Sequence, residues 1–194
     1  MNRRWVLLLI FLCYFGMCNT YSQDGNDGTH ERWEYILEDT GDVLQIALPL
    51  SAGLATIFQK DYQGTKQLAF SYATTMALTY TLKYTTKRQR PEGRTSYDSF
   101  PSGHTSSAFS GASFIQRRYG WKYGKYAYIL AALTGVSRME GPDGYHDIWD
   151  VLGGAAVGIG STYIFTKPYE NPKIEVSFSA NKDMKLLTFR WNIN

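Results

Sequence analysis

Four apolar segments, separated by polar residues that favour turns, dominate the hydrophobic pattern of the chain. They are Val43–Phe58, Leu68–Leu82, Tyr126–Val136 and Val151–Phe165. Each segment is too long for an ordinary strand, so the pattern predicts helices. A fifth helix, rich in small residues, is expected over Thr105–Arg117. The chain is therefore expected to be all-α, a helical bundle.

The last apolar segment contains an unusual number of glycines. Gly153, Gly154, Gly158 and Gly160 lie among alanines. Glycine lowers helix propensity, so these positions are explained if a neighbouring helix approaches closely there.

The C-terminal residues follow a different period. Hydrophobic and polar residues alternate over Lys173–Ser179, and a second alternation follows from Leu187 to Ile193. Two alternating runs joined by a short polar turn predict a β-hairpin over residues 173–194. Because its faces alternate, one face is expected to be buried against the bundle or against a partner.

The N-terminal residues have the pattern of a secretory signal peptide. Two arginines precede the apolar stretch Trp5–Phe15, and small residues at Thr20 and Ser22 mark a cleavage site before Gln23. Residues 1–22 are expected to be removed, with an uncleaved anchor helix as the alternative. Residues 23–40 are expected to be a polar segment that precedes a domain over residues 41–168.

Charge and cysteine content narrow the class of protein. The net charge of +3 falls to +1 when the signal peptide, with its two arginines and no acid, is removed. A nearly neutral protein does not indicate a nucleic-acid partner. Both cysteines, Cys13 and Cys18, lie in the signal peptide, so a disulfide framework and a thiolate metal site are excluded from the mature chain. An exported, cysteine-free domain favours the periplasm or the cell surface.

The apolar segments are short for a membrane protein. They contain 16, 15, 11 and 15 residues, and the mean hydropathy of the chain is −0.30. A membrane span needs about 20 apolar residues. The pattern therefore favours a bundle that is peripheral to a membrane surface, and the alternative is an integral membrane protein with a periplasm-facing site.

Three polar stretches carry the candidate chemistry. In KYTTKRQRP, residues 83–91, cations crowd the polar end of an apolar segment. In SFPSGHTSS, residues 99–107, a loop turns into a helix whose first turn Ser102 can cap, and a helix N-terminus suits a phosphate. In SRMEGPDGYHDIWD, residues 137–150, His146 and Asp150 are four residues apart and share one helix face.

Together these stretches contain the groups needed to move a phosphoryl group. They offer fixed cations, a helix N-terminus, one histidine that could donate a proton and one histidine backed by a carboxylate. The sequence has neither a glycine-rich nucleotide loop nor a cluster with metal-ligand spacing, so no metal and no cofactor are expected.

The three stretches resemble the motifs of the type 2 phosphatidic acid phosphatase family, which shares its core with vanadium-dependent haloperoxidases and bacterial class A acid phosphatases. The matching residues are, in order, Lys83-x6-Arg90-Pro91, Pro101-Ser102-Gly103-His104 and Ser137-Arg138…His146-x3-Asp150. The family usually has five residues between the arginine and the histidine of the third motif, whereas this chain has seven, Met139–Tyr145. Because of these two extra residues, whether the Arg138 side chain can contact the phosphate has to be tested on the structure.

The resemblance implies a role for each matching residue. The catalytic residues would be His146 as nucleophile, Asp150 as its orienting partner, and His104, which would protonate the leaving oxygen. The substrate phosphate would be bound by Lys83, Arg90, Ser102, Gly103 and Arg138.

The family also implies a class of substrate. It handles phosphatidic acid, phosphatidylglycerophosphate, undecaprenyl pyrophosphate, lipid A phosphates and soluble phosphomonoesters. An exported member is expected to be a metal-independent phosphatase of cell-envelope lipids that works through a phosphohistidine. The alternatives are a vanadate-dependent haloperoxidase and a non-enzymatic envelope protein with a relic site.

Overall fold

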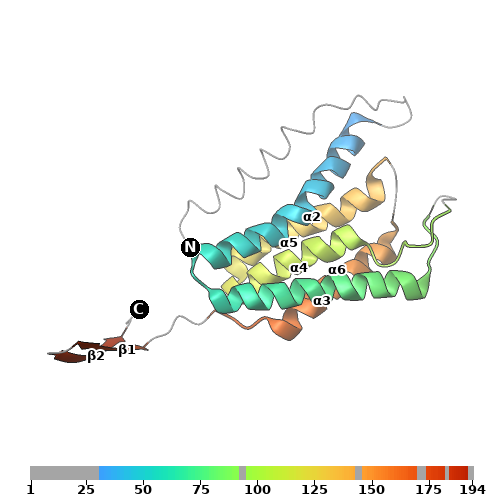
Figure 1. The fold of residues 1–194 in the computed structure, drawn as a ribbon. Coiled ribbons are helices and arrows are strands. Elements are labelled where there is room, and N and C mark those ends of the chain that lie inside the picture. Colours follow the sequence, from blue (N-terminus) through green and yellow to red (C-terminus); the bar gives the residue numbers. More distant parts are fainter. Residues whose placement is uncertain (1–30, 92–94, 143–145, 170–173, 182–183, 192–194) are drawn as a thin grey trace.

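Five helices and one β-hairpin make up the described part of the protein (Figure 1). The computed structural model describes residues 31–91, 95–142, 146–169, 174–181 and 184–191. The elements are α2 (Arg32–Phe58), α3 (Tyr62–Thr86), α4 (Gly103–Tyr119), α5 (Trp121–Glu140), α6 (Ile148–Phe165), β1 (Ile174–Asn181) and β2 (Met184–Trp191). The predicted all-α bundle with a short hairpin is confirmed. The signal peptide expected over residues 1–22 lies outside the described residues.

Helix α2 begins well before the apolar segment that predicted it. Its first residue is Arg32, because Glu31 and Glu34 form a capping box at this point. The polar segment expected over residues 23–40 is therefore helical from Arg32 onward. This extension carries Glu38 and Asp42 toward the other helices, as described below.

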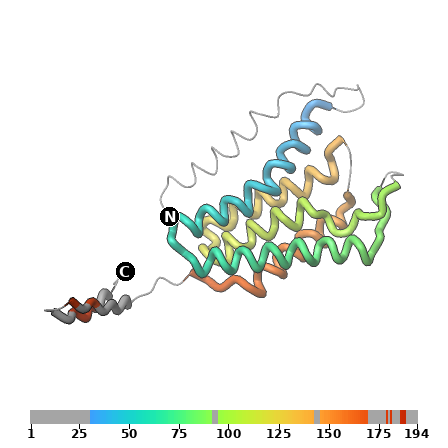
Figure 2. The backbone as a smooth tube through the Cα atoms, in the orientation of Figure 1, coloured from blue at the N-terminus to red at the C-terminus, as the bar shows by residue number. Residues whose placement is uncertain are grey.

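Helix α4 lies at the centre of the bundle and contacts each of the other four helices. Most of its side chains are buried, and many of them are small. Phe114 is fully buried and packs in the core with residues such as Leu48, Ala112 and Ala131. Figure 2 shows the backbones of α2, α3, α5 and α6 around it. The small side chains of α4 allow four neighbours to approach at once.

Two of the four glycines in α6 mark a close helix contact. A Cβ atom on Gly158 would lie 2.5 Å from the carbonyl oxygen of Ser106, and one on Gly154 would lie 2.6 Å from that of Ser102. The expected close approach is confirmed at these positions, and the neighbour is the backbone of α4. A Cβ atom on Gly160 would meet no atom within 4 Å, so packing does not explain that glycine.

Strands β1 and β2 form the predicted hairpin. They pair antiparallel, with Val176 opposite Phe189 and Ile174 opposite Trp191. Burial of one face against the bundle is not observed: the described strands make no contact with the described helices, and they lie apart from the bundle in Figure 1. Leu186 and Leu187 are exposed.

Candidate active site

A cavity of about 620 Å³ opens at the end of the bundle where α3 and α5 finish and α4 and α6 begin. Six of the eight residues singled out in the sequence line it, namely Lys83, Arg90, Gly103, His104, Arg138 and His146. The other two, Ser102 and Asp150, are fully buried beside it. Helix packing therefore gathers three stretches that are far apart in the sequence.

His146 and Asp150 form a buried pair at the start of α6. The Nδ1 atom of His146 lies 3.4 Å from Oδ2 of Asp150, within ion-pair range but without the geometry of a full hydrogen bond. Asp150 is held by the hydroxyl of Ser99, by Nη1 of Arg88 at 3.0 Å and by the N–H of Asp147 at 3.2 Å. These contacts fix the carboxylate behind the imidazole.

The environment of His146 favours its neutral form. Burial lowers the pKa of the imidazole below its ordinary value, the contact with Asp150 opposes this only in part, and positive charge on Lys83 adds to the decrease. A neutral imidazole has a lone pair available for attack on phosphorus.

The loop between α3 and α4 presents two cations to the cavity. Arg90 donates two hydrogen bonds to the Asp98 carboxylate, at 2.9 and 3.0 Å. These bonds lower the pKa of Asp98 below its ordinary value, so the carboxylate remains charged and holds the guanidinium in place. Lys83 donates to the carbonyl oxygens of Asp98 and Ser99. The loop therefore positions both side chains that the first motif supplies.

Ser102 caps α4, as the sequence predicted. Its hydroxyl oxygen accepts from the N–H of Thr105 at 3.4 Å and from the Thr105 hydroxyl at 3.0 Å, and its own N–H donates to the carbonyl oxygen of Asp150 at 2.9 Å. The side chain is buried and does not line the cavity, whereas Gly103 and His104 do. Ser102 thus ties the start of α4 to the start of α6.

Arg138 and His104 meet at a carboxylate that sequence reasoning missed. Oδ1 of Asp42 lies 2.9 Å from Nη1 of Arg138 and 3.0 Å from Nε2 of His104. Arg138 also donates to the carbonyl oxygen of Glu38 at 2.8 Å. Arg138 reaches the cavity despite the two extra residues before His146, and residues 143–145 of that loop lie outside the described residues.

A glycine brings Asp42 to this position. A Cβ atom on Gly41 would lie 1.8 Å from the Ser137 hydroxyl oxygen, so only glycine lets α2 approach α5 this closely. The sequence signal was a Gly-Asp pair at the start of an apolar run, which by itself resembles an ordinary helix boundary.

Arg88 and Asp147 hold Asp150 and the start of α6 in place. Arg88 forms an ion pair with Asp147 at 2.5 Å in addition to its contact with Asp150. Asp147 caps α6 by accepting from the N–H groups of Trp149 and Asp150. The spacing of Asp147 and Asp150 is a capping-box signal that could have been recognised. Among the described residues, no group of three or more His, Cys, Asp or Glu side chains is arranged to hold a metal ion.

The fold and the site define a class of protein: a helical bundle with a cationic, two-histidine cavity suited to a phosphate. A sequence profile of the PAP2 superfamily matches residues 64–173. A lipid A 4'-phosphatase from Helicobacter pylori is 36% identical over 161 residues, which cover 78% of this chain and 80% of that protein. The chain therefore belongs to the PAP2 superfamily. The prediction of a phosphatase is confirmed at this level.

Other relatives cover less of the chain or share only the fold. A lipid A 1-phosphatase from Porphyromonas gingivalis is 44% identical over 80 residues, which are 40% of this chain and 17% of that protein. The crystal structure of Aquifex aeolicus LpxE aligns with a TM-score of 0.60 and 23% identity, over 72% of this chain and 88% of that chain. A transmembrane PAP2-type phosphatidylglycerolphosphate phosphatase from Bacillus subtilis aligns with a TM-score of 0.55 and 20% identity, over 82% and 92%.

Proposed function

We propose that this phosphatase removes a phosphate from lipid A or a closely related cell-envelope lipid, through a phosphohistidine at His146. The observation that carries the proposal is the buried His146–Asp150 pair, which shares one cavity with His104 and three cations. The names of the two sequence relatives support lipid A as the substrate class.

In the first step, Nε2 of His146 attacks the phosphorus atom. Nδ1 faces Asp150, so Nε2 is the nitrogen left for the attack. The new P–N bond forms as the bond between phosphorus and the leaving oxygen breaks, and His104 gives its proton to that oxygen. Asp150 stabilises the positive charge that develops on the imidazole, as the acid does in a serine-protease triad.

In the second step, water replaces His146 on the phosphorus atom. His104, now neutral, takes a proton from the water as its oxygen attacks, and the P–N bond breaks. Inorganic phosphate leaves, and both histidines return to their starting states. General acid–base assistance of this kind is worth roughly 10²–10⁴ in rate.

Lys83, Arg90 and Arg138 would balance the charge of the phosphoryl group in both steps. All three line the cavity, and arginine can donate to two phosphate oxygens at once. The N–H groups at the start of α4, where Gly103 lies, would add donors aligned with the helix dipole.

We further infer that the bundle lies within the bilayer rather than on its surface. Each helix contains a run without any charged residue or histidine, and these runs, with adjoining residues, are 43–59, 67–82, 105–116, 126–137 and 151–166. The runs of α2, α3 and α6 contain at least 16 residues and extend about 24 Å, close to the hydrocarbon thickness of about 30 Å, whereas the runs of α4 and α5 contain 12 residues and extend about 18 Å. By length and composition, α2 and α6 could each cross a membrane.

Exposed side chains support this placement. Leu50, Ile129 and Ile164 are each at least 60% exposed although they are large and apolar. Soluble monomers rarely expose so much apolar surface. The embedded arrangement is therefore preferred to the peripheral one that the short apolar segments predicted. The site would face the periplasm, because the pattern of residues 1–22 favours export of the chain.

The test is phosphate release from purified protein in detergent, offered lipid A, phosphatidic acid, phosphatidylglycerophosphate, undecaprenyl pyrophosphate and a soluble phosphomonoester. Lipid A should be the preferred substrate. His146→Ala should abolish turnover and His104→Ala should slow it by roughly 10²–10⁴. His30→Ala is the matched control, because His30 lies outside the three motifs.

Three outcomes would contradict the proposal. Wild-type turnover in His146→Ala would exclude the nucleophile, and strong preference for another lipid would exclude the substrate class. Activity should persist in EDTA, and loss of activity that added magnesium or zinc restores would contradict the metal-independent site.

A further inference from the structure

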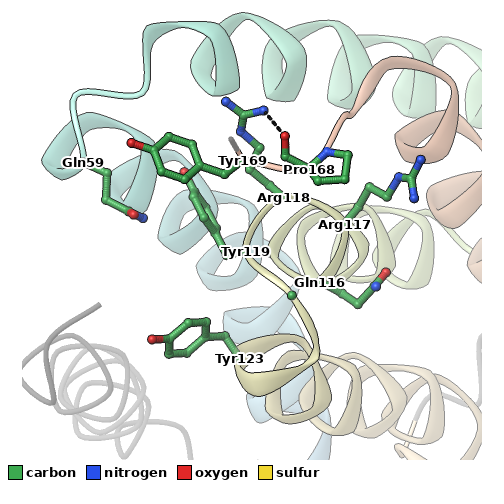
Figure 3. Close-up of a pocket in the computed structure, with 9 residues that line it drawn as sticks. Gln59, Gln116, Arg117, Arg118, Tyr119, Tyr123, Pro168 and Tyr169 are labelled. Carbon is green, nitrogen blue, oxygen red and sulfur yellow. Dashed lines mark hydrogen bonds between the residues drawn. The ribbon is translucent and has the colours of Figure 1, made fainter. Parts of the chain in front are cut away.

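A second cavity lies at the other end of the bundle, away from the two histidines. It has a volume of about 550 Å³ and is formed by the end of α2, the last turn of α4, the first turn of α5 and the segment that follows α6. Figure 3 shows the side chains that line it: Gln59, Gln116, Arg117, Arg118, Tyr119, Tyr123, Pro168 and Tyr169. The mechanism proposed above uses none of these residues.

Arg118 lines this cavity and holds the surrounding segments together. Its guanidinium forms a buried pair with both oxygens of Asp61, at 2.5 and 2.7 Å, and donates to the carbonyl oxygens of Lys167 and Pro168 at 2.9 and 3.1 Å. The Tyr119 hydroxyl donates to Asp61 as well. The charge of Arg118 is therefore neutralised by Asp61, and its contacts fix the segment after α6 against α4.

Arg117, by contrast, uses only its Nε atom as a hydrogen-bond donor within the described residues. Its Nε donates to the carbonyl oxygen of Thr166 at 3.2 Å, and its guanidinium carbon lies 4.9 Å from the centre of the Tyr163 ring. Within the described part of the chain its two Nη groups form no hydrogen bond or ion pair. The Nε2 atom of Gln59 is also buried and has no hydrogen-bond partner among the described residues. Both side chains line the cavity, and the Nη groups of Arg117 and the Nε2 atom of Gln59 could donate to an oxygen acceptor bound there.

The surroundings of the cavity are cationic. The described residues at this end include seven basic side chains: Lys60, Lys66, Arg117, Arg118, Lys122, Lys125 and Lys167. In the same part of the structure Asp61 is the single acid, and Arg118 already neutralises it. An anionic ligand is therefore strongly favoured over a neutral or cationic one.

The same end also carries exposed aromatic side chains. Phe58, Tyr62, Trp121 and Tyr126 are each more than half exposed, and they lie where the charge-free runs of α2, α3 and α5 meet the basic residues. Aromatic rings mixed with basic residues at the edge of an apolar belt are typical of the lipid headgroup region. A free anion would need only the basic residues, whereas a lipid explains both features.

We propose that this cavity binds the phosphate of an anionic phospholipid headgroup, in the leaflet opposite the catalytic site. Arg117 and Gln59 would donate to the phosphate oxygens, and the acyl chains would lie along the charge-free faces of the helices. The proposal rests on the membrane placement inferred above but does not depend on the phosphatase activity.

The test uses the full chain in a neutral detergent. The thermal unfolding midpoint is measured with added dioleoyl phosphatidylglycerol, with dioleoyl phosphatidylcholine and with inorganic phosphate. Phosphatidylglycerol carries a phosphodiester, so it is not a monoester substrate. It should raise the midpoint in a saturable way, and phosphatidylcholine should not. Inorganic phosphate can also bind the catalytic cavity, so any shift that it causes should be the same in the wild type and in Arg117→Gln.

Arg117→Gln should weaken the apparent affinity for phosphatidylglycerol about fivefold, and Lys122→Gln should do so to a similar extent, since a basic residue near an anionic surface contributes about 1 kcal/mol. Lys87→Gln, at the catalytic end of α3, is the matched control and should change nothing. Turnover of a soluble phosphomonoester should be the same in Arg117→Gln as in the wild type. If Arg117→Gln does not fold, the exposed Lys122→Gln provides the same comparison.

Three outcomes would overturn the proposal. They are no shift with phosphatidylglycerol, a shift with inorganic phosphate that Arg117→Gln weakens as much as it weakens the shift with phosphatidylglycerol, or a phosphatidylglycerol shift that neither Arg117→Gln nor Lys122→Gln weakens. Because the readout is binding, a protein without lipid A phosphatase activity could still pass this test, and an active phosphatase could fail it.

Discussion

Asp42 places a negative charge between two groups that the proposed mechanism assigns to the substrate. One of its oxygens contacts both Nε2 of His104 and Nη1 of Arg138. The carboxylate therefore occupies a position where a phosphate oxygen could bind. It holds both side chains in place and, at the same time, competes with the anionic substrate.

Replacing Asp42 by asparagine should separate these two effects. The amide keeps the size of the side chain but removes the charge, so we expect kcat to fall about tenfold as His104 loses a charge-assisted contact. KM should fall as well, because the competing charge is gone. Steady-state kinetics with a soluble phosphomonoester measures both constants, and Glu140→Gln, an exposed acid at the end of α5, is the control. An unchanged kcat would show that Asp42 does not support His104.

The buried imidazole of His146 should titrate below its ordinary range. Burial lowers the pKa of His146, so the unfolded chain takes up its proton first as the pH falls. The native protein should thus lose stability from about pH 6.5 downward, over the range between the two pKa values. NMR of histidine-labelled protein, assigned with His146→Asn, measures the value directly. A pKa at or above about 6.5 would contradict the burial argument.

Helices α4 and α6 depend on backbone contacts that only glycine permits. Gly154 and Gly158 lie against the backbone of α4, so the start of α6, with Asp150, is held beside the start of α4, with His104. The cap residue Ser102 joins the same two helix ends through its bond to Asp150. The glycine contacts of α6 thus contribute to the geometry of the site.

Adding one methyl group at two positions in α6 tests this interface. Gly158→Ala should lower stability by about 1–3 kcal/mol, because the new Cβ would meet backbone atoms of Ser106 and Ser110. Gly160→Ala faces open space and should be neutral or stabilise the helix by up to about 1 kcal/mol. Thermal unfolding in detergent compares the two variants. Equal destabilisation by both would show that helix packing is not the cause.

The whole molecule is organised along the axis of the bundle. One end holds the two-histidine cavity, the charge-free runs occupy the middle, and the basic cavity lies at the other end. The hairpin of β1 and β2 stands apart from this arrangement, since its described residues do not contact the described helices.

Deleting residues 170–194 should leave the catalytic site intact. The truncated protein should keep the kcat of the full chain on a soluble phosphomonoester and unfold at the same temperature. Enzyme assays and thermal unfolding check both expectations. A marked loss of stability would indicate that the hairpin packs on the bundle after all.

The embedded bundle should resist extraction from membranes. High salt and alkaline carbonate should leave the protein in the membrane fraction, and only a detergent that dissolves the bilayer should release it. Immunoblots of the fractions give the answer. Release by carbonate would support the peripheral arrangement instead.

Much of the site could be predicted from sequence because its chemistry is locally encoded. Lys83, Arg90, His104, Arg138 and His146 stand out through residue type, spacing and turn context, and they line one cavity. Asp42 could not be found in this way, because it is 96 residues from Arg138 and its only local signal is a helix boundary. Ser102 is a buried helix cap, as predicted, and its contact with the phosphate stays a prediction.

Local patterns in the sequence predicted the helices, the hairpin and the three motifs, since periodicity, caps and turn residues act over a few positions. Which distant residues these elements bring together depends on how the helices pack. Gly41 lets α2 bring Asp42 to His104, and Arg118 joins the end of α4 to Asp61, 57 residues away. The five charge-free runs form one continuous apolar zone around the bundle only because the helices pack side by side. Such contacts depend on the shapes of two surfaces meeting, which no local pattern records.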